Sequence, residues 1–206
     1  MFRQIVPVLL EHPGKAVIMT RFALIGYRCT GKSSVGKKLA SRMGVPFFDS
    51  DMIIMDRAGT SIADIVATEG WRRFRKCEEE VIYDLASVED AVIALGGGAL
   101  DNARNRAVLE RAQFRFVWLT ADPETIMARM TADENTDRAR PSLLNEKMEA
   151  ETRRMLARRE PVYRDAADLI CNTSHKSIDS VVDKLYHDLF TKDISWQETH
   201  SEPSSK

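Results

Sequence analysis

The segment Gly26-Tyr27-Arg28-Cys29-Thr30-Gly31-Lys32-Ser33 determines what fold the chain can adopt. An apolar run at residues 22–25 precedes it and a helix-forming run at residues 34–40 follows it, so the expected order is strand, loop and helix. This is the phosphate-binding loop pattern G-x-x-x-x-G-K-[S/T] in the context that supports it. Glycine permits close backbone approach to a phosphate, and the helix N-terminus attracts the anion. The segment predicts a nucleoside triphosphate site; a chance glycine-containing turn is the alternative.

The residues of this loop have different expected roles. Lys32 should reach the β- and γ-phosphates, and the Ser33 hydroxyl should hold Mg²⁺. The residues expected to contact the nucleotide are Cys29, Thr30, Gly31, Lys32, Ser33 and Ser34. The motif predicts that a triphosphate binds, but the fate of its phosphate must be inferred from the rest of the chain.

Composition limits the classes of partner. The 206 residues fit one domain, and a net charge of -1 from 30 basic and 31 acidic residues is not that of a nucleic-acid binder. The three cysteines Cys29, Cys77 and Cys171 lack metal-ligand spacing, which favours reduced thiols and a cytoplasmic location. No apolar stretch approaches the about 18 residues of a membrane span. We therefore expect a cytoplasmic monomer without nucleic-acid or membrane partners.

The ends of the chain differ in character from its middle. Residues 1–19 precede the first expected strand and are interpreted as a poorly ordered extension, or as upstream of a start at Met19. Residues 191–206 are polar and rich in serine and glutamate, which is typical of a frayed tail. A single domain is expected over residues 20–190.

Strands and helices alternate along this domain. The strands are expected at residues 21–26, 45–48, 91–95, 114–119 and 168–171. Helices are expected at 32–42, 52–58, from a Ser61 or Thr60 cap to 68, 71–87, 103–111, 123–130, 145–159 and 177–190. This alternation predicts an α/β fold, a three-layer α/β/α sandwich around a parallel, five-stranded sheet, with ligands at the carboxyl ends of the strands.

Two aspartates follow the second strand directly, in Asp49-Ser50-Asp51. Side chains that alternate along a strand point to opposite sides, so the two carboxylates suit different tasks. Asp49 should face Mg²⁺ through water, and Asp51 should accept a hydrogen bond from the hydroxyl to be phosphorylated and take its proton. Helix capping by either aspartate is the alternative, and it is compatible with catalysis.

Glycines and arginines complete the expected site. Gly96-Gly97-Gly98 ends the third strand and would offer amide donors at close range, or simply a flexible turn. Arg75 and Glu78 are spaced i to i+3 on one helix, so the carboxylate would orient the guanidinium. Arg140 or Arg138, at the end of the polar stretch 131–141, would clamp the transferring phosphoryl group. Solvated faces are expected for Arg72, Arg73, Arg153, Arg154 and Arg158.

These motifs, taken in order, resemble those of the shikimate kinases, which are P-loop small-molecule kinases of the nucleoside-monophosphate-kinase-like group. The resemblance covers residues 21–190 and rests on GYRCTGKSSVG, FFDSDMII, TSIADIVATEGWRRFRKCEEEVI, LGGGAL, ARPSLL and RREPVYRDAAD. It implies phosphorylation of the shikimate 3-hydroxyl by ATP with Mg²⁺, giving shikimate 3-phosphate on the chorismate route to aromatic amino acids.

The resemblance also implies roles for single residues. Shikimate-binding positions of the family correspond to Asp51, Arg75, Gly97 and Arg159, with Gly98 beside them. Two guanidiniums suit the shikimate carboxylate, because they offer forked hydrogen bonds. Arg140 corresponds to the arginine of a mobile lid at about residues 131–142, which would exclude water and would contact both ATP and the transferred group.

The chain departs from the family pattern at three places. Cys29 stands where the family often has glycine or another small residue, so we expect alkylation of its thiol to block ATP. Ser142 interrupts the usual end of the lid. Met130 stands where relatives often place an arginine against adenine. Either Arg129 contacts the adenine instead, or the base packs on Met130 and on a residue near Ile178.

Two rival functions remain open at this point. Another small-molecule kinase of the same fold, acting on gluconate or a nucleoside monophosphate, would keep the loop and lid but need a different acceptor site. A regulatory module that binds ligand without transfer should lose the loop lysine or the acceptor aspartate, yet the chain has both Lys32 and Asp51.

Overall fold

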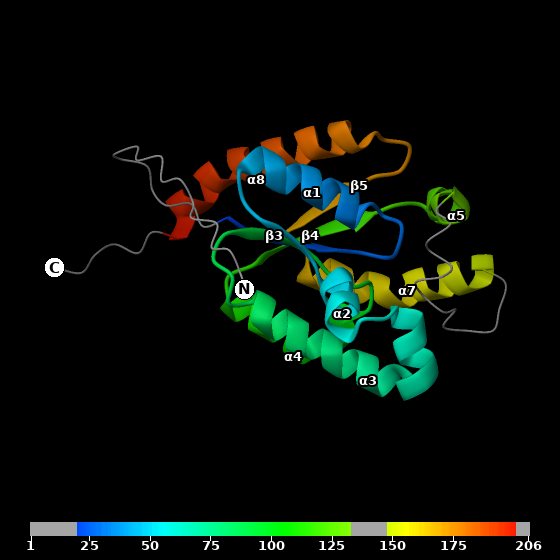
Figure 1. Cartoon of the computed structure of the whole chain (residues 1–206). Coiled ribbons are helices and arrows are strands. Elements are labelled where there is room, and N and C mark those ends of the chain that lie inside the picture. Colours follow the sequence, from blue (N-terminus) through cyan, green and yellow to red (C-terminus); the bar gives the residue numbers. More distant parts are fainter. Residues whose placement is uncertain (1–19, 133–147, 201–206) are drawn as a thin grey trace.

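The computed structural model describes residues 20–132 and 148–200 (Figure 1). The expected extension at 1–19 and most of the expected lid, with Arg138, Arg140 and Ser142, lie outside the described residues. Within the two described ranges, no helix combines the length and the apolar composition needed to cross a bilayer.

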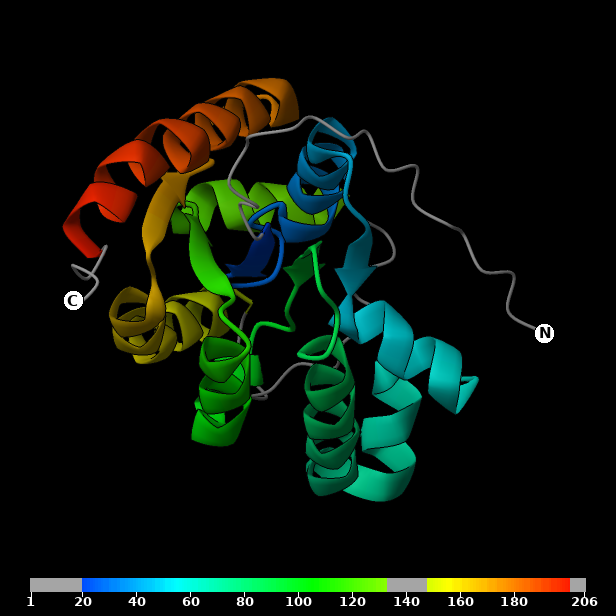
Figure 2. The ribbon, with the colours of Figure 1, turned by 90° about the vertical axis from the view of Figure 1, so that its left-hand side faces the viewer.

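A five-stranded parallel sheet forms the centre of the molecule (Figures 1 and 2). Its order is β2-β3-β1-β4-β5, and every neighbouring pair is parallel. The strands are β1 (Arg21–Ile25), β2 (Phe47–Asp49), β3 (Ala91–Ala94), β4 (Arg115–Thr120) and β5 (Leu169–Asn172). The predicted fold class, with five parallel strands between layers of helices, is confirmed.

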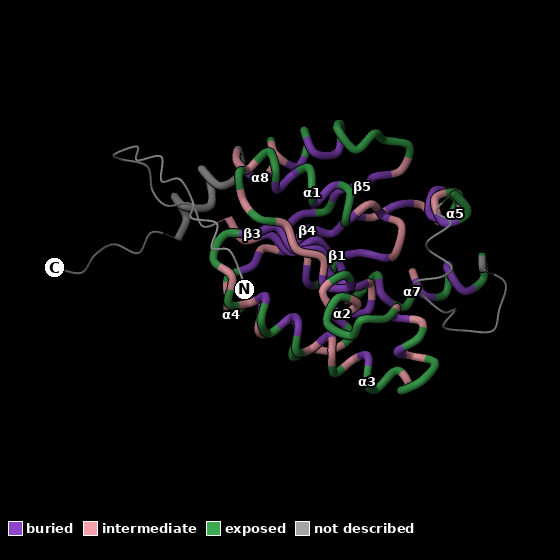
Figure 3. The backbone as a smooth tube through the Cα atoms, in the orientation of Figure 1, coloured by how far each residue is buried: buried purple, intermediate pink, exposed green. Residues whose placement is uncertain are grey.

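Helices cover both faces of the sheet (Figure 1). One face packs against α1 (Lys32–Met43) and α8 (Ile178–His200), and the other against α3 (Ile62–Leu85), α4 (Ala103–Arg111) and α7 (Met148–Ala166). Strand β1 supplies both cores, because its side chains alternate: Phe22 and Leu24 belong to the first core, Ala23 and Ile25 to the second. Burial on both faces explains the continuous apolar runs of the central strands: β3 is buried along its whole length, and β1 and β4 are buried except at their ends (Figure 3).

Local signals set most helix boundaries. Helix α2 (Ser50–Ala58) begins after Asp49, whose carboxylate accepts from the Asp51 and Met52 amides. Ser61 caps α3, and the expected interruption at Gly70 is a kink within that helix. Helix α5 (Pro123–Ala132) follows β4, and a short 3₁₀ turn, η1 (Ala99–Asp101), follows the triple glycine.

Two predicted helix ends were wrong. Helix α7 was expected to stop at Arg159, but it continues through Pro161 to Ala166. Proline removes one backbone hydrogen bond, and burial of Tyr163 and Ala166 against the sheet outweighs that cost. Helix α8 was expected to end at residue 190 but continues to His200, because residues 191–200 contain neither glycine nor proline. The first part of the expected polar tail is therefore helical.

Candidate active site

The loop between β1 and α1 has the geometry of an anion site. Gly26 has φ 136°, and a Cβ placed there would lie 2.2 Å from the Leu119 carbonyl oxygen, so the position requires glycine. The Thr30 hydroxyl donates to the Tyr27 carbonyl at 2.8 Å, which fixes the loop from inside. Helix α1 begins at Lys32 directly behind it, so its free amides and positive dipole end are directed at the loop.

Lys32 and Ser33 are held at the start of α1. The buried Nζ of Lys32 donates to the carbonyls of Gly26 at 2.9 Å and of Tyr27 at 2.8 Å. The Ser33 hydroxyl donates to Asp49 Oδ2 at 2.5 Å. The Oδ1 atom of the same carboxylate caps α2 by accepting from the Asp51 amide at 3.1 Å. Asp49 therefore caps α2, as one of the two interpretations expected, and also faces the phosphate loop; its metal-binding role stays a prediction.

This hydroxyl and carboxylate fit a magnesium ion. Mg²⁺ prefers hard oxygen ligands, and in nucleotide enzymes it takes one or two from the protein and the rest from phosphates and water. Ser33 and Asp49 supply such oxygens next to the anion site. Among the described residues no group of three or more acidic, histidine or cysteine side chains could hold a metal ion.

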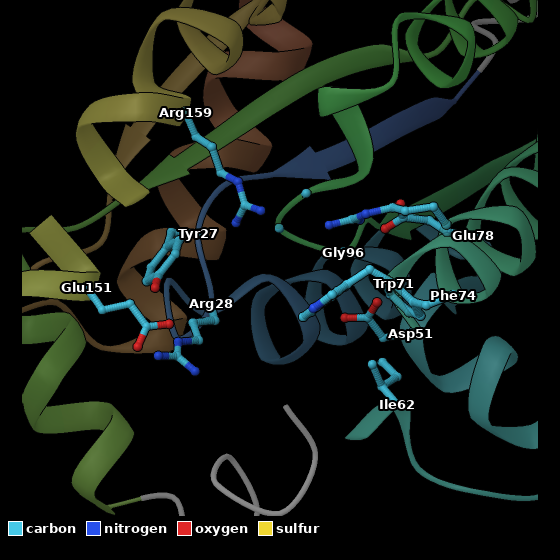
Figure 4. Close-up of a pocket in the computed structure, with 13 residues that line it drawn as sticks. Tyr27, Arg28, Asp51, Ile62, Trp71, Phe74, Glu78, Gly96, Glu151 and Arg159 are labelled. Carbon is cyan, nitrogen blue, oxygen red and sulfur yellow. The ribbon is translucent and has the colours of Figure 1, made fainter. Parts of the chain in front are cut away.

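A cavity lies beside the loop, at the carboxyl ends of β1 and β3 (Figure 4). All five residues expected to bind the acceptor line it: Asp51, Arg75, Gly97, Gly98 and Arg159. Its walls also include Gly96 and Glu78, which the sequence had indicated. The other wall residues had been given no role at the acceptor: Tyr27, Arg28, Ile62, Trp71, Phe74 and Glu151. The cavity combines an apolar wall, a pair of arginines and a carboxylate, which suits a small anionic molecule with hydroxyl groups.

The two arginines come from different helices and meet above Gly98. A Cβ placed on Gly98 would lie 2.5 Å from Arg75 Nη2 and 2.7 Å from Arg159 Nη2. Arg75 Nη1 donates to Glu78 Oε2 at 2.6 Å, as its i to i+3 spacing predicted, and Arg159 Nη2 donates to Asp101 Oδ2 at 3.3 Å. Both guanidiniums are thus oriented by carboxylates and converge on one point, where they can grip one anionic group.

Asp51 and Glu78 lie on either side of Gly96. A Cβ placed on Gly96 would be 2.7 Å from Asp51 Oδ1 and 2.9 Å from Glu78 Oε1. The buried Ser50 hydroxyl accepts from the Gly96 amide at 3.0 Å and ties the glycine segment to α2. Burial raises the pKa of the Glu78 carboxyl, and the neighbouring Arg75 guanidinium acts in the opposite direction.

Asp49 and Asp51 face different parts of the site, but not because their side chains alternate along a strand, as the sequence pattern had predicted. The sequence placed both at the end of a strand, with alternating directions. In the structure only Asp49 belongs to β2, and Asp51 lies in the first turn of α2. The start of the helix turns Asp51 into the acceptor cavity while Asp49 remains beside Ser33.

Tyr163 is a site residue that sequence reasoning missed. Its hydroxyl donates to the Gly97 carbonyl, so it fixes the glycine segment from α7. This contact exists only because α7 continues past Pro161. Tyr163 is four residues after Arg159, on the same helix face, and that spacing is the signal that would have found it.

The acceptor cavity collects unpaired polar atoms. In the described part of the chain six buried side-chain atoms have no hydrogen-bond partner, and three of them belong to cavity residues: Arg28 Nε, Glu78 Oε1 and Arg159 Nε. Buried polar groups are rarely left unpaired unless a ligand or water completes them. Their concentration here marks the cavity as a ligand site.

A second hollow on the other side of the loop suits the nucleotide base. Its walls include Gly31, Ser34, Arg129 and Ile178. Arg129 donates to the Thr173 carbonyl at 2.7 Å and to the Cys29 carbonyl at 3.2 Å, which holds its guanidinium near the loop. Met130 is only 3% exposed and packs in an apolar cluster with Ile126, away from this hollow. Arg129, the first of the two alternatives, lines this hollow, whereas of the pair in the second alternative only Ile178 does; the contact with adenine stays a prediction.

The remaining arginines divide as expected. The five expected on solvated faces are all exposed: Arg72, Arg73, Arg153, Arg154 and Arg158. Arg140 and Arg138, expected to clamp the phosphoryl group, lie outside the described residues, so their role stays a prediction.

A phosphate-binding loop beside a cavity with paired arginines and an aspartate, at the carboxyl edge of a β2-β3-β1-β4-β5 sheet, defines a nucleotide-dependent small-molecule kinase. Comparison with known proteins specifies the family. The model of the family described as shikimate kinase matches residues 28–190, and the chain belongs to this family.

Individual relatives agree with this assignment. The shikimate kinase of Syntrophus aciditrophicus is 42% identical over 170 residues, which cover 79% of this chain and 87% of the relative. That of Rhodopirellula baltica is 38% identical, covering 79% and 86% of the two chains. Among solved structures, shikimate kinase from Acinetobacter baumannii in complex with shikimate has a TM-score of 0.78 and 31% identity, covering 85% of this chain and 95% of that one.

Proposed function

We propose that this protein transfers the γ-phosphoryl group of ATP to the 3-hydroxyl of shikimate, giving shikimate 3-phosphate and ADP. The observation that carries the proposal is the meeting of Arg75, Arg159 and Asp51 in one cavity beside the phosphate loop. Shikimate is a small ring with one carboxylate and three hydroxyls. The two guanidiniums match its carboxylate, and Asp51 matches a hydroxyl. Family membership and the shikimate complex of the Acinetobacter baumannii relative support this choice of acceptor.

Asp51 performs the acid–base part of the transfer. Its carboxylate accepts a hydrogen bond from the 3-hydroxyl, and this bond orients the hydroxyl oxygen towards the triphosphate. The carboxylate then receives the hydroxyl proton as the new P–O bond forms. The Gly97 and Gly98 amides, held by Tyr163, border the same space and help to fix the ring. Positioning of the two reactants contributes most in such reactions, since phosphoryl transfer needs little covalent help from the protein.

Lys32 stabilises the charge of the phosphates. In the structure its ammonium group lies on the carbonyls of Gly26 and Tyr27, close to the loop amides. When a triphosphate occupies the loop, phosphate oxygens become stronger partners for the ammonium than neutral carbonyls. We propose that Ser33 and Asp49 hold Mg²⁺, which neutralises phosphate charge when bound. We also propose that Arg140 contacts the transferred group from the lid.

The rival kinases need a different acceptor site. Gluconate has a flexible polyol chain, and a nucleoside monophosphate has a flat base as well as a phosphate. Each of them carries an anionic group that the two guanidiniums above Gly98 could bind, but neither presents a compact ring to the apolar wall that contains Ile62 and Phe74. The cavity therefore favours a compact ring acid.

Removal of either cavity arginine tests the proposal. Arg75→Ala or Arg159→Ala should raise the Kd of shikimate about 10- to 100-fold, as expected for the loss of a charged hydrogen bond, with ATP affinity nearly unchanged. Calorimetric titration of each ligand measures both effects. Arg72→Ala, an exposed position on the same helix as Arg75, is the matched control and should behave as wild type. Wild-type shikimate affinity in either cavity variant would contradict the proposed acceptor site.

A further inference from the structure

Arg28 is a third arginine of the acceptor cavity, and none of the roles above uses it. It belongs to the phosphate loop, two residues after Gly26, but its side chain lines the same cavity as Asp51 and Arg159. Its main chain borders the glycine segment, since a Cβ placed on Gly97 would lie 3.7 Å from the Arg28 amide nitrogen. Arg28, like its neighbour Tyr27, thus belongs to the nucleotide loop and also lines the acceptor site.

The side chain of Arg28 lacks a complete set of partners. Its guanidinium stacks over the Tyr27 ring at 5.7 Å, and its Nε is buried without a hydrogen-bond partner. A buried unpaired donor costs about 1–3 kcal/mol, and more when the group is charged. Oxygen atoms of a bound anion would remove that cost, because a guanidinium offers donors in a fork that matches phosphate oxygens.

The position of Arg28 indicates which anion this is. Arg75 and Arg159 converge at Gly98, so that end of the cavity is already supplied with charge for a carboxylate. In Figure 4, Arg28 and Tyr27 lie across the cavity from Asp51 and Ile62, with Glu151 at the same end. The phosphoryl group enters the cavity from the loop that carries Arg28 and ends on the hydroxyl held by Asp51. Arg28 lies on the loop side of this path, and Asp51 lies at its other end.

We propose that Arg28 binds the oxygens of the transferred phosphoryl group, both during transfer and in shikimate 3-phosphate. The assignment rests on the proposed function. It makes Arg28 a residue that distinguishes product from substrate: it contacts the phosphate that only the product carries and adds little to the binding of shikimate itself.

The test compares two ligands in two variants. Arg28→Met keeps a long apolar side chain but removes the charge, and Arg28→Lys keeps the charge but loses the fork. Titration with shikimate and with shikimate 3-phosphate, without nucleotide, gives two dissociation constants for each protein. Arg72→Met removes one exposed positive charge outside the cavity and is the matched control. Thermal unfolding of each variant verifies that it is folded.

Arg28→Met should raise the Kd of shikimate 3-phosphate about 10- to 100-fold. Its shikimate affinity should change by less than about fivefold, as in Arg72→Met. The affinity of Arg28→Lys for shikimate 3-phosphate should lie between those of wild type and Arg28→Met. The kcat values should decrease in the order wild type, Arg28→Lys, Arg28→Met. Equal weakening of shikimate and shikimate 3-phosphate binding would mean that Arg28 contacts the shikimate ring, and this would overturn the proposal. Unchanged affinity for shikimate 3-phosphate would also overturn it. Failure of the wild type to convert shikimate would instead refute the proposed function, which the same preparation tests separately.

Discussion

The absence of side chains at the triple glycine sets the geometry of the acceptor site. Gly96 lets the Asp51 and Glu78 carboxylates approach the backbone, and Gly98 does the same for two guanidiniums. The sequence indicated close approach here and predicted Arg75, Asp51 and Arg159 from the resemblance to a family. It did not indicate Ser50 or Tyr163, because their hydrogen bonds join segments far apart in the chain.

Gly98→Ala tests this use of glycine. The new methyl group would lie 2.5 Å from Arg75 and 2.7 Å from Arg159, so both guanidiniums must move. Because the displaced guanidiniums would no longer hold shikimate in place, we expect kcat/KM for shikimate to fall about 100-fold, with unchanged ATP affinity. Gly97→Ala is the control, since its Cβ meets no atom nearer than 3.5 Å. An equal loss in both variants would show that the arginine contacts are not the cause.

Glu78 makes stability depend on pH. Burial raises the pKa of the Glu78 carboxyl in the folded protein above its ordinary value. Its contribution to stability is therefore fully present below the pKa of the unfolded chain and is lost as pH rises through the folded pKa. Glu78→Gln cannot ionise and should escape this loss. The difference in Tm, variant minus wild type, should therefore increase from about pH 4 to pH 8. A difference that shrinks with rising pH would mean that the ion pair with Arg75 dominates.

Helices α2 and α7 position the reactive groups. The Asp49 cap begins α2 at the point that turns Asp51 into the cavity. Capping residues and helix-ending glycines are local signals, so the starts of these elements were predictable. The continuation of α7 through Pro161 was not, because packing of Tyr163 and Ala166 against the sheet outweighs a local helix breaker.

Two substitutions separate the capping and metal-binding roles of Asp49. Asparagine caps a helix about as well as aspartate, so Asp49→Asn should keep the free energy of unfolding within a few tenths of a kcal/mol, whereas Asp49→Ala should lose about 1 kcal/mol. Both remove the carboxylate beside Ser33, so both should need more Mg²⁺ for half-maximal activity. Urea unfolding and magnesium titration measure the two effects. Equal destabilisation, or unchanged magnesium dependence in Asp49→Asn, would contradict this dual role.

The parallel sheet brings the separate motifs together. Loops after β1, β2 and β3 end at the same edge, and α3 and α7 add their arginines there from one face (Figures 1 and 4). Alternating strands and helices predicted the layers and the common edge. The strand order and the mutual approach of Arg75 and Arg159 depend on non-local packing, which periodicity does not encode.

Product analysis with shikimate and Mg-ATP tests the central claim most directly. Purified protein is incubated with ATP, Mg²⁺ and shikimate, with gluconate and AMP in parallel reactions, and the products are identified by mass spectrometry. The account predicts shikimate 3-phosphate in amounts equal to the ADP formed, and neither product in the parallel reactions. ADP without shikimate 3-phosphate, or phosphorylation of gluconate or AMP instead, would contradict it.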